Sequence, residues 1–374
     1  MSTLPADTPA DACLAGGGDA GALLRSIDWS KSPLGPVSTW PTTLRTTVGI
    51  MLSSSFAMRV LWGPDFIFLH NDAYRPVLGA TKYPSAMGSR CADSFAELWD
   101  VVGPMFHRVM AGETVALDDR ILPLERYGYL EECFFTLSYS PLSDDRGGIG
   151  GVLGIVYETT QRVIAERRLH ALRQLAAGVA RARTTAEVCT IAAETFAHAG
   201  ADVPFALFYL HGSDDTGARL VASTGLDAYP AARPPVVELA PSSDPTLWPL
   251  AASGDARMSR VTNIRARYGE LHGGPYPEPI TNAIVIPLRR AGGAVPYGYW
   301  VVGLSPRRAF DADYEAFLEL AAEHIGAAIA NAVAIDYIES EQRRLRSFLH
   351  TRRRPPSRSS AVRGSSTTSS TIAS

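Results

Sequence analysis

At Glu158-Thr159-Thr160 the hydrophobic pattern changes from that of strands to that of a helix. This change constrains the fold of the chain more than any other feature of its sequence. Ahead of it, long apolar runs are typical of antiparallel strands, and the Gly-rich segment SDDRGGIGG predicts the turn between two of them. Behind it, residues 161–182 contain no proline, and no glycine before Gly178, which indicates a helix. A sheet strand is therefore expected to pass directly into a long helix, with Thr159 or Thr160 as its N-cap.

The segment ahead of this point predicts a mixed α and β unit. Residues 56–69 alternate as the strands of a β-hairpin do, around a Gly63-Pro64-Asp65 turn, and short helical pieces follow through about Arg108. Long antiparallel strands then form a meander that ends at Glu158. The first 22 residues are rich in Ala, Gly and Asp, and we expect them to be disordered.

The segment behind it predicts a second unit of the same kind: a helix, two strands, a Pro/Gly-rich middle, two more strands and a closing helix of residues 311–348. The 161–182 helix and the closing helix both carry small or apolar residues at 3-4-3 spacing. These are Leu169, Leu172, Ala176 and Val179 in the first helix, and Ile325, Ala328, Ala332 and Ile335 in the second. This spacing is typical of paired helices, so we expect a homodimer through helices 161–182 and 311–348.

The charge balance excludes several classes of partner. The 35 Lys+Arg and 38 Asp+Glu residues give a net charge of -3, so no overall basic field attracts nucleic acid or an anionic membrane. The N-terminal residues contain no apolar run of the kind a signal peptide needs. The most apolar stretch, residues 317–335, includes Glu319, Glu323 and His324, which favours an amphipathic helix over a membrane span. These observations predict a cytoplasmic protein.

Two segments carry a family resemblance. GPDFIFLHNDAYRPVLG (residues 63–79) and FTLSYSPLSDDRGGIGGVLGIVYETTQR (residues 135–162) resemble a PAS domain, with Glu158-Thr159-Thr160 at the position of its exit motif. Residues of about 185–335 are similar to a GAF domain. The N-terminal segment IDWSKSPLGPVSTWPTTLRT resembles the lead-in of bacterial PAS–GAF sensor histidine kinases and hybrid kinases. The H, N and G boxes of their kinase core are absent from this sequence.

The resemblance implies an α+β fold of two domains, each an antiparallel sheet flanked by helices, linked and followed by coiled-coil-type helices. The predicted ranges are 23–160 for the PAS domain with its helical lead-in, 161–184 for the signalling helix, 185–335 for the GAF domain and 336–350 for the continuation of its exit helix. Residues 351–374 are basic and rich in Ser and Thr, and we expect a disordered tail. One hypothesis is that this tail is a frameshifted remnant; the alternative is a genuine short sensor with a disordered tail.

Aromatic residues on the predicted sheets are candidates to line ligand pockets. They are Trp62, Tyr74, Phe135 and Tyr139 in the PAS-like segment, and Tyr209 and Trp300 in the GAF-like segment. Because neighbours in a strand point to opposite faces, only one of Tyr299 and Trp300 can face a pocket. The scattered cysteines and histidines lack the spacing of a metal site. We therefore predict no metal, no catalytic residue and no cofactor, and leave an unidentified small ligand open.

The resemblance implies a cytosolic sensory module of a two-component phosphorelay system. The signal exit would be Glu158, Thr159 and Thr160, and the expected partners are a second copy of the chain and a histidine kinase or response regulator. Two alternatives remain open. One is a truncated sensor histidine kinase, whose full-length form would phosphorylate protein histidine with ATP. The other is a PAS–GAF adaptor that binds a partner regulator.

Overall fold

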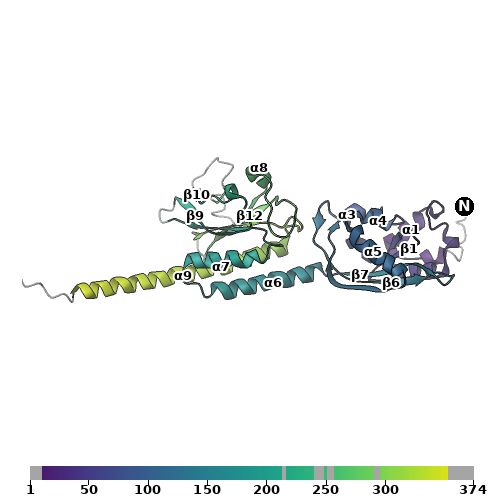
Figure 1. The fold of residues 1–374 in the computed structure, drawn as a ribbon, viewed down its shortest axis with the longest axis horizontal. Helices are drawn as coiled ribbons and strands as arrows, with labels where there is room; N and C mark the ends of the chain where they lie inside the picture. Colours follow the sequence, from purple (N-terminus) through teal and green to yellow (C-terminus); the bar gives the residue numbers. More distant parts are fainter. Residues whose placement is uncertain (1–10, 213–215, 240–247, 251–256, 290–294, 353–374) are drawn as a thin grey trace, which may run out of the picture.

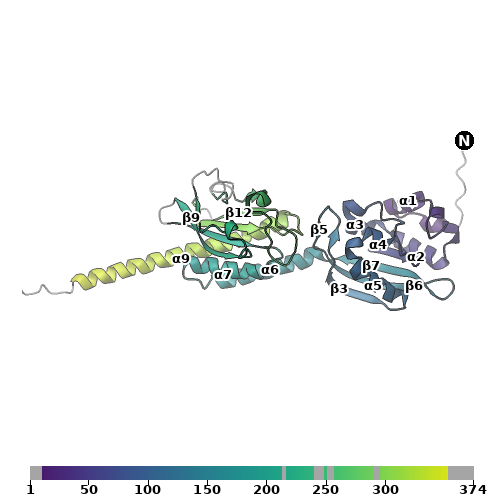
Figure 2. The same ribbon diagram turned by 45° about the horizontal axis from the view of Figure 1, so that its top comes forward.

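The computed structural model describes residues 11–212, 216–239, 248–250, 257–289 and 295–352, and it contains two α+β units arranged end to end (Figure 1). The N-terminal unit comprises residues 11–158, and the C-terminal unit comprises residues 160–352. Helix α6 (Thr160–Val179) runs from one unit along the other, and α9 (Ala312–Arg352) projects from the far end of the molecule (Figures 1 and 2). The predicted tail lies outside the described residues from residue 353 onward.

A five-stranded antiparallel sheet with the order β2-β1-β7-β6-β3 forms the N-terminal unit. The strands are β1 (Ala57–Trp62), β2 (Ile67–His70), β3 (Val115–Ile121), β6 (Phe134–Ser143) and β7 (Ile149–Glu158). The pairing of β1 with β2 confirms the predicted hairpin, and β6 and β7 pair on either side of the Gly-rich turn. A small hairpin of β4 (Leu124–Glu125) and β5 (Leu130–Glu131) interrupts the predicted meander between β3 and β6.

Both faces of strands β1 and β2 are covered. Leu61 and Phe68 pack in an inner core together with residues of α3 (Arg75–Lys82), α4 (Cys91–Ser94) and α5 (Trp99–Met110). Val60, Trp62 and Leu69 pack in an outer core with residues of α1 (Gly18–Ser26) and α2 (Thr42–Ser53). Short 3-10 helices occupy Asp11–Leu14, Trp29–Lys31, Val37–Thr39, Asp72–Tyr74, Ala96–Leu98 and Pro230–Ala232.

The disorder expected for residues 1–22 does not hold from residue 11 onward. Leu14, Ala20 and Leu24 are buried in the outer core, since the apolar outer face of β1 and β2 needs cover. The side chain of Asp72 accepts hydrogen bonds from the backbone N–H groups of Asp19 and Ala20, at 3.1 and 2.7 Å. An acceptor supplied by a distant segment thus caps α1, which the local sequence could not show.

The C-terminal unit is built on a six-stranded antiparallel sheet with the order β10-β9-β8-β13-β12-β11. The strands are β8 (Ala206–His211), β9 (Gly217–Thr224), β10 (Val236–Glu238), β11 (Ser259–Val261), β12 (Ala283–Leu288) and β13 (Gly298–Gly303). Helices α6, α7 (Thr185–Ala197) and α9 share a core with one face of this sheet, and α8 (Ile264–Tyr268) packs on the other face. The two units confirm the predicted fold class of antiparallel sheets flanked by helices.

The buried stripe of α6 differs from the predicted seam. Ile164, Arg168, Ala171, Leu175 and Val179 are buried, whereas Leu169 is 47 % exposed. The reason is that α6 packs against α7 and α9 of its own chain, and this packing selects a face rotated away from the predicted one. Of the predicted seam, Val179 is buried and Leu172 is partly buried against the same core, so intramolecular packing covers part of the surface that the sequence assigned to a partner helix.

Helix α9 has a buried part and an exposed part. Ile325, Ala328 and Ala332 of its predicted seam are buried in the core of the C-terminal unit, and Ile335 is exposed. By length and composition alone, Ala312–Arg346 would suffice to cross a membrane. Its apolar residues up to Ala332 instead lie in the core that they share with α6, α7 and the sheet.

Helix α1 provides a direct test of the lead-in. We expect Ala20→Asp to lower the free energy of unfolding by about 2–4 kcal/mol, because it buries an unpaired carboxylate against the sheet. Ala22→Asp, on the exposed face of the same helix, should change it by less than about 0.5 kcal/mol. Urea denaturation followed by circular dichroism measures both. Equal stabilities for the two variants would contradict the packing of α1.

Candidate functional site

A row of residues crosses the inner face of the N-terminal sheet. Arg59 on β1 lies opposite His70 on β2 and Gly154 on β7, and Gly154 lies opposite Tyr139 on β6. A Cβ atom at position 154 would stand 2.9 Å from Arg59 Cγ and 3.1 Å from Nε. The missing side chain therefore lets Arg59 lie across the sheet, where Nη2 donates a hydrogen bond of 2.6 Å to the Tyr139 hydroxyl.

This row forms one side of a cavity of about 20 Å³. The lining residues are Arg59, Tyr74, Val77, Phe95, Leu98, Val102, Leu122, Leu124, Phe135, Leu137, Tyr139 and Val156. Three of the residues predicted to line a pocket, Tyr74, Phe135 and Tyr139, are among them. Trp62 is not, because it points to the outer face of the sheet and packs in the outer core.

Burial controls the protonation of the cavity side chains. Desolvation raises the pKa of Tyr74 and of Tyr139, so both phenols are neutral at physiological pH. It also raises the pKa of the nearby Cys91 thiol to about 11. Arg59 is 4 % exposed and keeps its charge, since arginine is not deprotonated in proteins. The cavity therefore presents one cation among neutral groups.

Sequence reasoning missed Arg59. Its signal is a single charge in the strand AMRVLW, whose neighbours Met58, Val60 and Leu61 are all apolar. A charged residue in a strand buried on both faces is uncommon and needs a local partner. The pattern alone could not say that Gly154, on the neighbouring strand β7 of the sheet, would give that side chain its room.

In the C-terminal unit, the two predicted pocket residues are taken up by packing. Trp300 stacks with Phe196 at 4.8 Å and with Phe208 at 5.9 Å between ring centroids, on the helix side of the sheet. Tyr209 lies on the opposite side, and its hydroxyl donates a 3.1 Å hydrogen bond to the Pro234 carbonyl. Tyr299 shares the face of Tyr209, so the predicted alternation of Tyr299 and Trp300 is confirmed.

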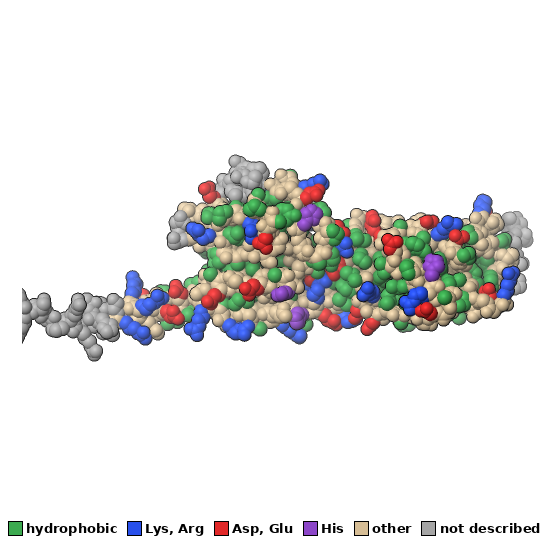
Figure 3. Space-filling model, viewed as in Figure 1, with side chains coloured by type: hydrophobic (Ala, Val, Ile, Leu, Met, Phe, Trp, Pro, Cys, Tyr) green, Lys and Arg blue, Asp and Glu red, His purple; other side chains and the backbone are tan. Residues whose placement is uncertain are grey.

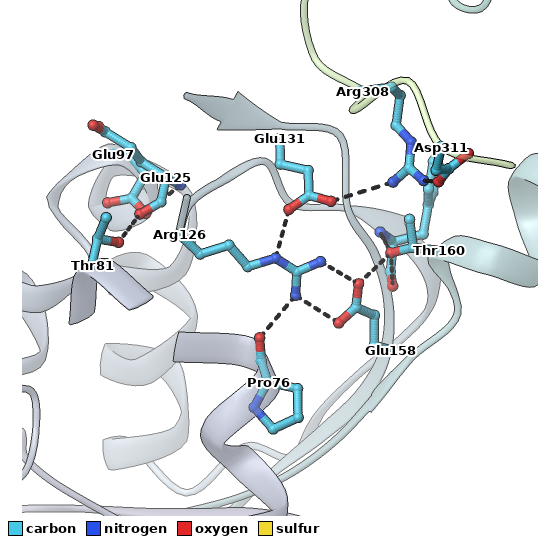
Figure 4. A network of polar contacts seen from close by, with 11 residues as sticks. Pro76, Thr81, Glu97, Glu125, Arg126, Glu131, Glu158, Thr160, Arg308 and Asp311 are labelled. Carbon is cyan, nitrogen blue, oxygen red and sulfur yellow. Dashed lines mark hydrogen bonds and ion pairs between the residues drawn. The ribbon is translucent and has the colours of Figure 1, made fainter. Parts of the chain in front are cut away.

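The exit motif is held by a cluster of charged groups at the end of β7. Arg126 donates two hydrogen bonds of 2.7 Å to the Glu158 carboxylate and one of 2.7 Å to Glu131 (Figure 4). The Thr160 hydroxyl donates to Glu158 at 2.8 Å and accepts a hydrogen bond of 2.9 Å from the Phe134 N–H. Arg126 thus ties the β4–β5 hairpin to the last strand at the start of α6. We call this contact the Arg126 clamp.

The Arg126 clamp continues into the C-terminal unit. Glu131 accepts a hydrogen bond from Arg308 at 3.4 Å, and Arg308 pairs with Asp311 at 3.7 Å, next to the start of α9 (Figure 4). A second contact uses α6 itself. There Arg167 binds Glu132 of the N-terminal unit at 2.7 Å and Asp202 of the C-terminal unit at 2.7 Å. The Arg167–Glu132 pair is bidentate, with bonds of 2.7 and 3.0 Å from Nη1 and Nη2. Because bidentate arginine–carboxylate pairs are directional, this contact fixes how the two units lie against each other.

Metal binding finds no support in the parts of the chain that the structure describes. Within them, no group of three His, Cys, Asp or Glu side chains lies close enough together to hold a metal ion, and the four cysteines form no disulfide with one another. The absence of a cofactor stays a prediction.

Comparisons with known proteins agree with the first of the two expected domains. Residues 53–164 match the family model described as PAS fold, which includes the cavity and the Arg126 clamp. No curated protein matches the chain.

Solved structures with some likeness include GAF domains and a phytochrome. The GAF domain of an Acinetobacter phosphoenolpyruvate-protein phosphotransferase is 19% identical, covers 44% of this chain and 94% of its own, and has a TM-score of 0.34. A putative GAF sensor protein from Burkholderia vietnamiensis is 17% identical, over 45% of this chain and 96% of its own, at 0.32. The Stigmatella aurantiaca phytochrome photosensory core module is 14% identical, over 77% of this chain and 59% of its own, at 0.34.

The Arg126 clamp predicts a specific instability. We expect Arg126→Met to lower the free energy of unfolding by about 2–4 kcal/mol, because Glu131 and Glu158 would lose the cation that they share. Hydrogen exchange should also become faster in the first turns of α6. Arg146→Met, at an exposed turn, is the matched control and should change neither quantity. The clamp would be refuted if exchange in α6 were the same in both variants.

Glu132 predicts a dependence on pH. Burial alone would raise its pKa, but the hydrogen bonds and charge of Arg167 outweigh burial and hold the pKa of Glu132 below its ordinary value of 4.5. A carboxyl group whose pKa is lowered by folding stabilises the folded state above the unfolded pKa. This stabilisation is lost as the pH falls below about 4.5 through the folded pKa.

The expected result is a smaller loss of thermal stability between pH 6 and about pH 3 in Glu132→Gln than in the wild type. Glu323→Gln, on the exposed side of α9, should retain the wild-type slope. Thermal denaturation across this range measures the effect. Identical slopes for all three proteins would show that Glu132 is not linked to folding in this way.

Proposed function

We propose that this chain is a cytoplasmic PAS–GAF sensory module of a two-component phosphorelay system, which passes the state of its N-terminal cavity to paired helices. The observation that carries the proposal is the register of the exit strand. Glu158, which the Arg126 clamp holds, is paired with Phe135, a residue that lines the cavity. The cavity wall and the start of α6 therefore share the same two strands.

The β4–β5 hairpin offers a second path by which a change in the cavity can reach the exit motif. Leu122 and Leu124 line the cavity, and Arg126 follows Leu124 by two residues. A shift of this wall on ligand binding would move the Arg126 guanidinium relative to Glu158. The position of the exit motif would change with it. Since buried packing has discrete arrangements rather than continuous ones, a small displacement can select between two positions of α6. A ligand has this effect only if it binds the two arrangements with different affinity.

The projecting end of α9 is the proposed output surface. Ile335, Ile338 and Leu345 lie at the spacing of paired helices, and Ile338 and Leu345 are 56 % and 60 % exposed. Charged side chains of both signs flank this end of the helix (Figure 3). We infer a parallel homodimer through this stripe, together with the exposed Leu169 of α6. A histidine kinase or response regulator would receive the signal from it.

The chain itself is proposed to be non-catalytic. No H, N or G box of a histidine kinase is present in the sequence, and His170 lies on α6 with neither the acidic neighbour nor the R-T-P of an H-box. Phosphohistidine formed from ATP by the purified chain would favour the partial-kinase alternative. Capture of a regulator without any kinase would favour the adaptor alternative.

The dimer is tested by one substitution in the exposed stripe. We expect Ile338→Lys to weaken self-association by about 100-fold, or about 3 kcal/mol, because two ammonium groups would face each other in an apolar seam. Ser340→Lys, which points away from the stripe, should dimerise as the wild type does. Light scattering coupled to size-exclusion chromatography over a concentration series measures both. A wild type that is still monomeric at about 100 µM would contradict the proposed output, because its dimerisation free energy would then be weaker than about 5 kcal/mol.

A further inference from the structure

The buried guanidinium of Arg59 has no carboxylate partner among the residues that the structure describes. Arg126, Arg168 and Arg308 are also buried, and each of them is paired with Asp or Glu. Arg59 instead lies against aromatic rings, with its guanidinium carbon 4.9 Å from the Tyr139 ring centroid and 5.0 Å from that of Phe106. Such contacts lower the free-energy cost of burying a cation, but they supply no negative charge. One positive charge therefore remains uncompensated in an apolar interior.

The polar groups that line the cavity have hydrogen-bond donors that are not used within the described residues. Within the described residues, Arg59 Nε has no hydrogen-bond partner and lies fully buried. The Tyr139 hydroxyl accepts from Arg59, so its own proton must point to another acceptor, and the structure records none for it among these residues. The Tyr74 hydroxyl also lies against Arg59. Every polar side chain of the cavity lining can therefore donate a hydrogen bond, and none of them is a carboxylate or an amide.

The size of the cavity limits what such donors can bind. A volume of about 20 Å³ holds one or two water-sized groups, since one water needs roughly 10–15 Å³ on the same measure. The remaining walls are Val, Leu and Phe side chains, which offer no hydrogen bonds, so a bound ion would depend on Arg59 and the two tyrosine hydroxyls to replace its water. A single cation balances a single negative charge, so a dianion would leave one charge unpaired.

We infer that this cavity binds a small monovalent anion no larger than about two water-sized groups, of the size and charge of formate, nitrite or azide. Arg59 would supply the charge, and the hydroxyls of Tyr74 and Tyr139 would supply further hydrogen bonds. Gly154 gives this arrangement its room. The role of the anion as a signal rests on the proposed function, whereas its binding does not.

The test uses the full chain in a buffer where sodium gluconate, a monoanion too bulky for the cavity, is replaced stepwise by formate, nitrite or azide. Total sodium stays constant, so the ionic strength does not change. We expect at least one of the three anions to raise the Tm of the chain saturably, by about 2–4 °C. No saturable rise with any of the three would overturn the inference.

Variants assign the effect to the cavity. Arg59→Met should abolish the Tm rise, and Arg90→Met should retain it, because Arg90 is an exposed arginine of the same unit. An equal response in Arg59→Met and the wild type would overturn the inference. Tyr139→Phe should weaken the apparent affinity about 5–10-fold, the cost of one lost hydrogen bond. If Arg59→Met does not fold, Tyr139→Phe decides the question. The inference is then overturned if the anion concentration that gives half of the Tm rise is the same in Tyr139→Phe and the wild type.

Hydrogen exchange separates this site from the proposed function. Anion binding that also changes exchange in α6 would support both. Saturable, Arg59-dependent binding that leaves α6 unchanged would support the anion site and contradict the proposed coupling to the helix.

Discussion

The structure depends on the ion pair between Arg126 and Glu158. Glu158 is the last residue of the central strand β7, and α6 begins two residues later. Arg126 binds this carboxylate with both terminal nitrogens, and it binds Glu131 with Nε. Because the guanidinium is planar and all three bonds are short, the hairpin, the exit strand and the helix start are held in one relative orientation. The Arg308 and Arg167 contacts extend this rigid junction to the second unit.

The cavity sits on the same elements as this junction. Phe135 and Tyr139 on β6 and Val156 on β7 line it, and the β3–β4 segment closes it. The residues that would contact a ligand and the start of the output helix α6 are therefore only a few residues apart on the paired strands β6 and β7. In the C-terminal unit, Trp300 and Tyr209 serve packing. A hollow of that unit is lined by Thr185, His211 and Tyr297 among others, and the described residues of its lining include no arginine. The sensing step of our proposal is placed in the N-terminal unit because the cavity there shares strands β6 and β7 with the exit motif.

The sequence predicted much of the fold, because its signals are local. The hairpin at Gly63-Pro64-Asp65, the Gly-rich turn before β7 and the proline-free helix after Thr160 all depend on backbone preferences of a few residues. The order of residues 11–22 and the buried face of α6 could not be read in the same way. Asp72 caps α1 from a distant position, and α7 and α9 select which side of α6 is buried.

The sequence by itself determined where strands give way to helices, and it pointed to Tyr74, Phe135 and Tyr139 as cavity-lining side chains. Only the tertiary structure decided that Trp62 faces away from them and that Arg59 lies among them. The physical reason is that the partners of a buried charge come from neighbouring strands. Gly154 and Tyr139 are far from Arg59 in the chain, and strand register alone brings them to it.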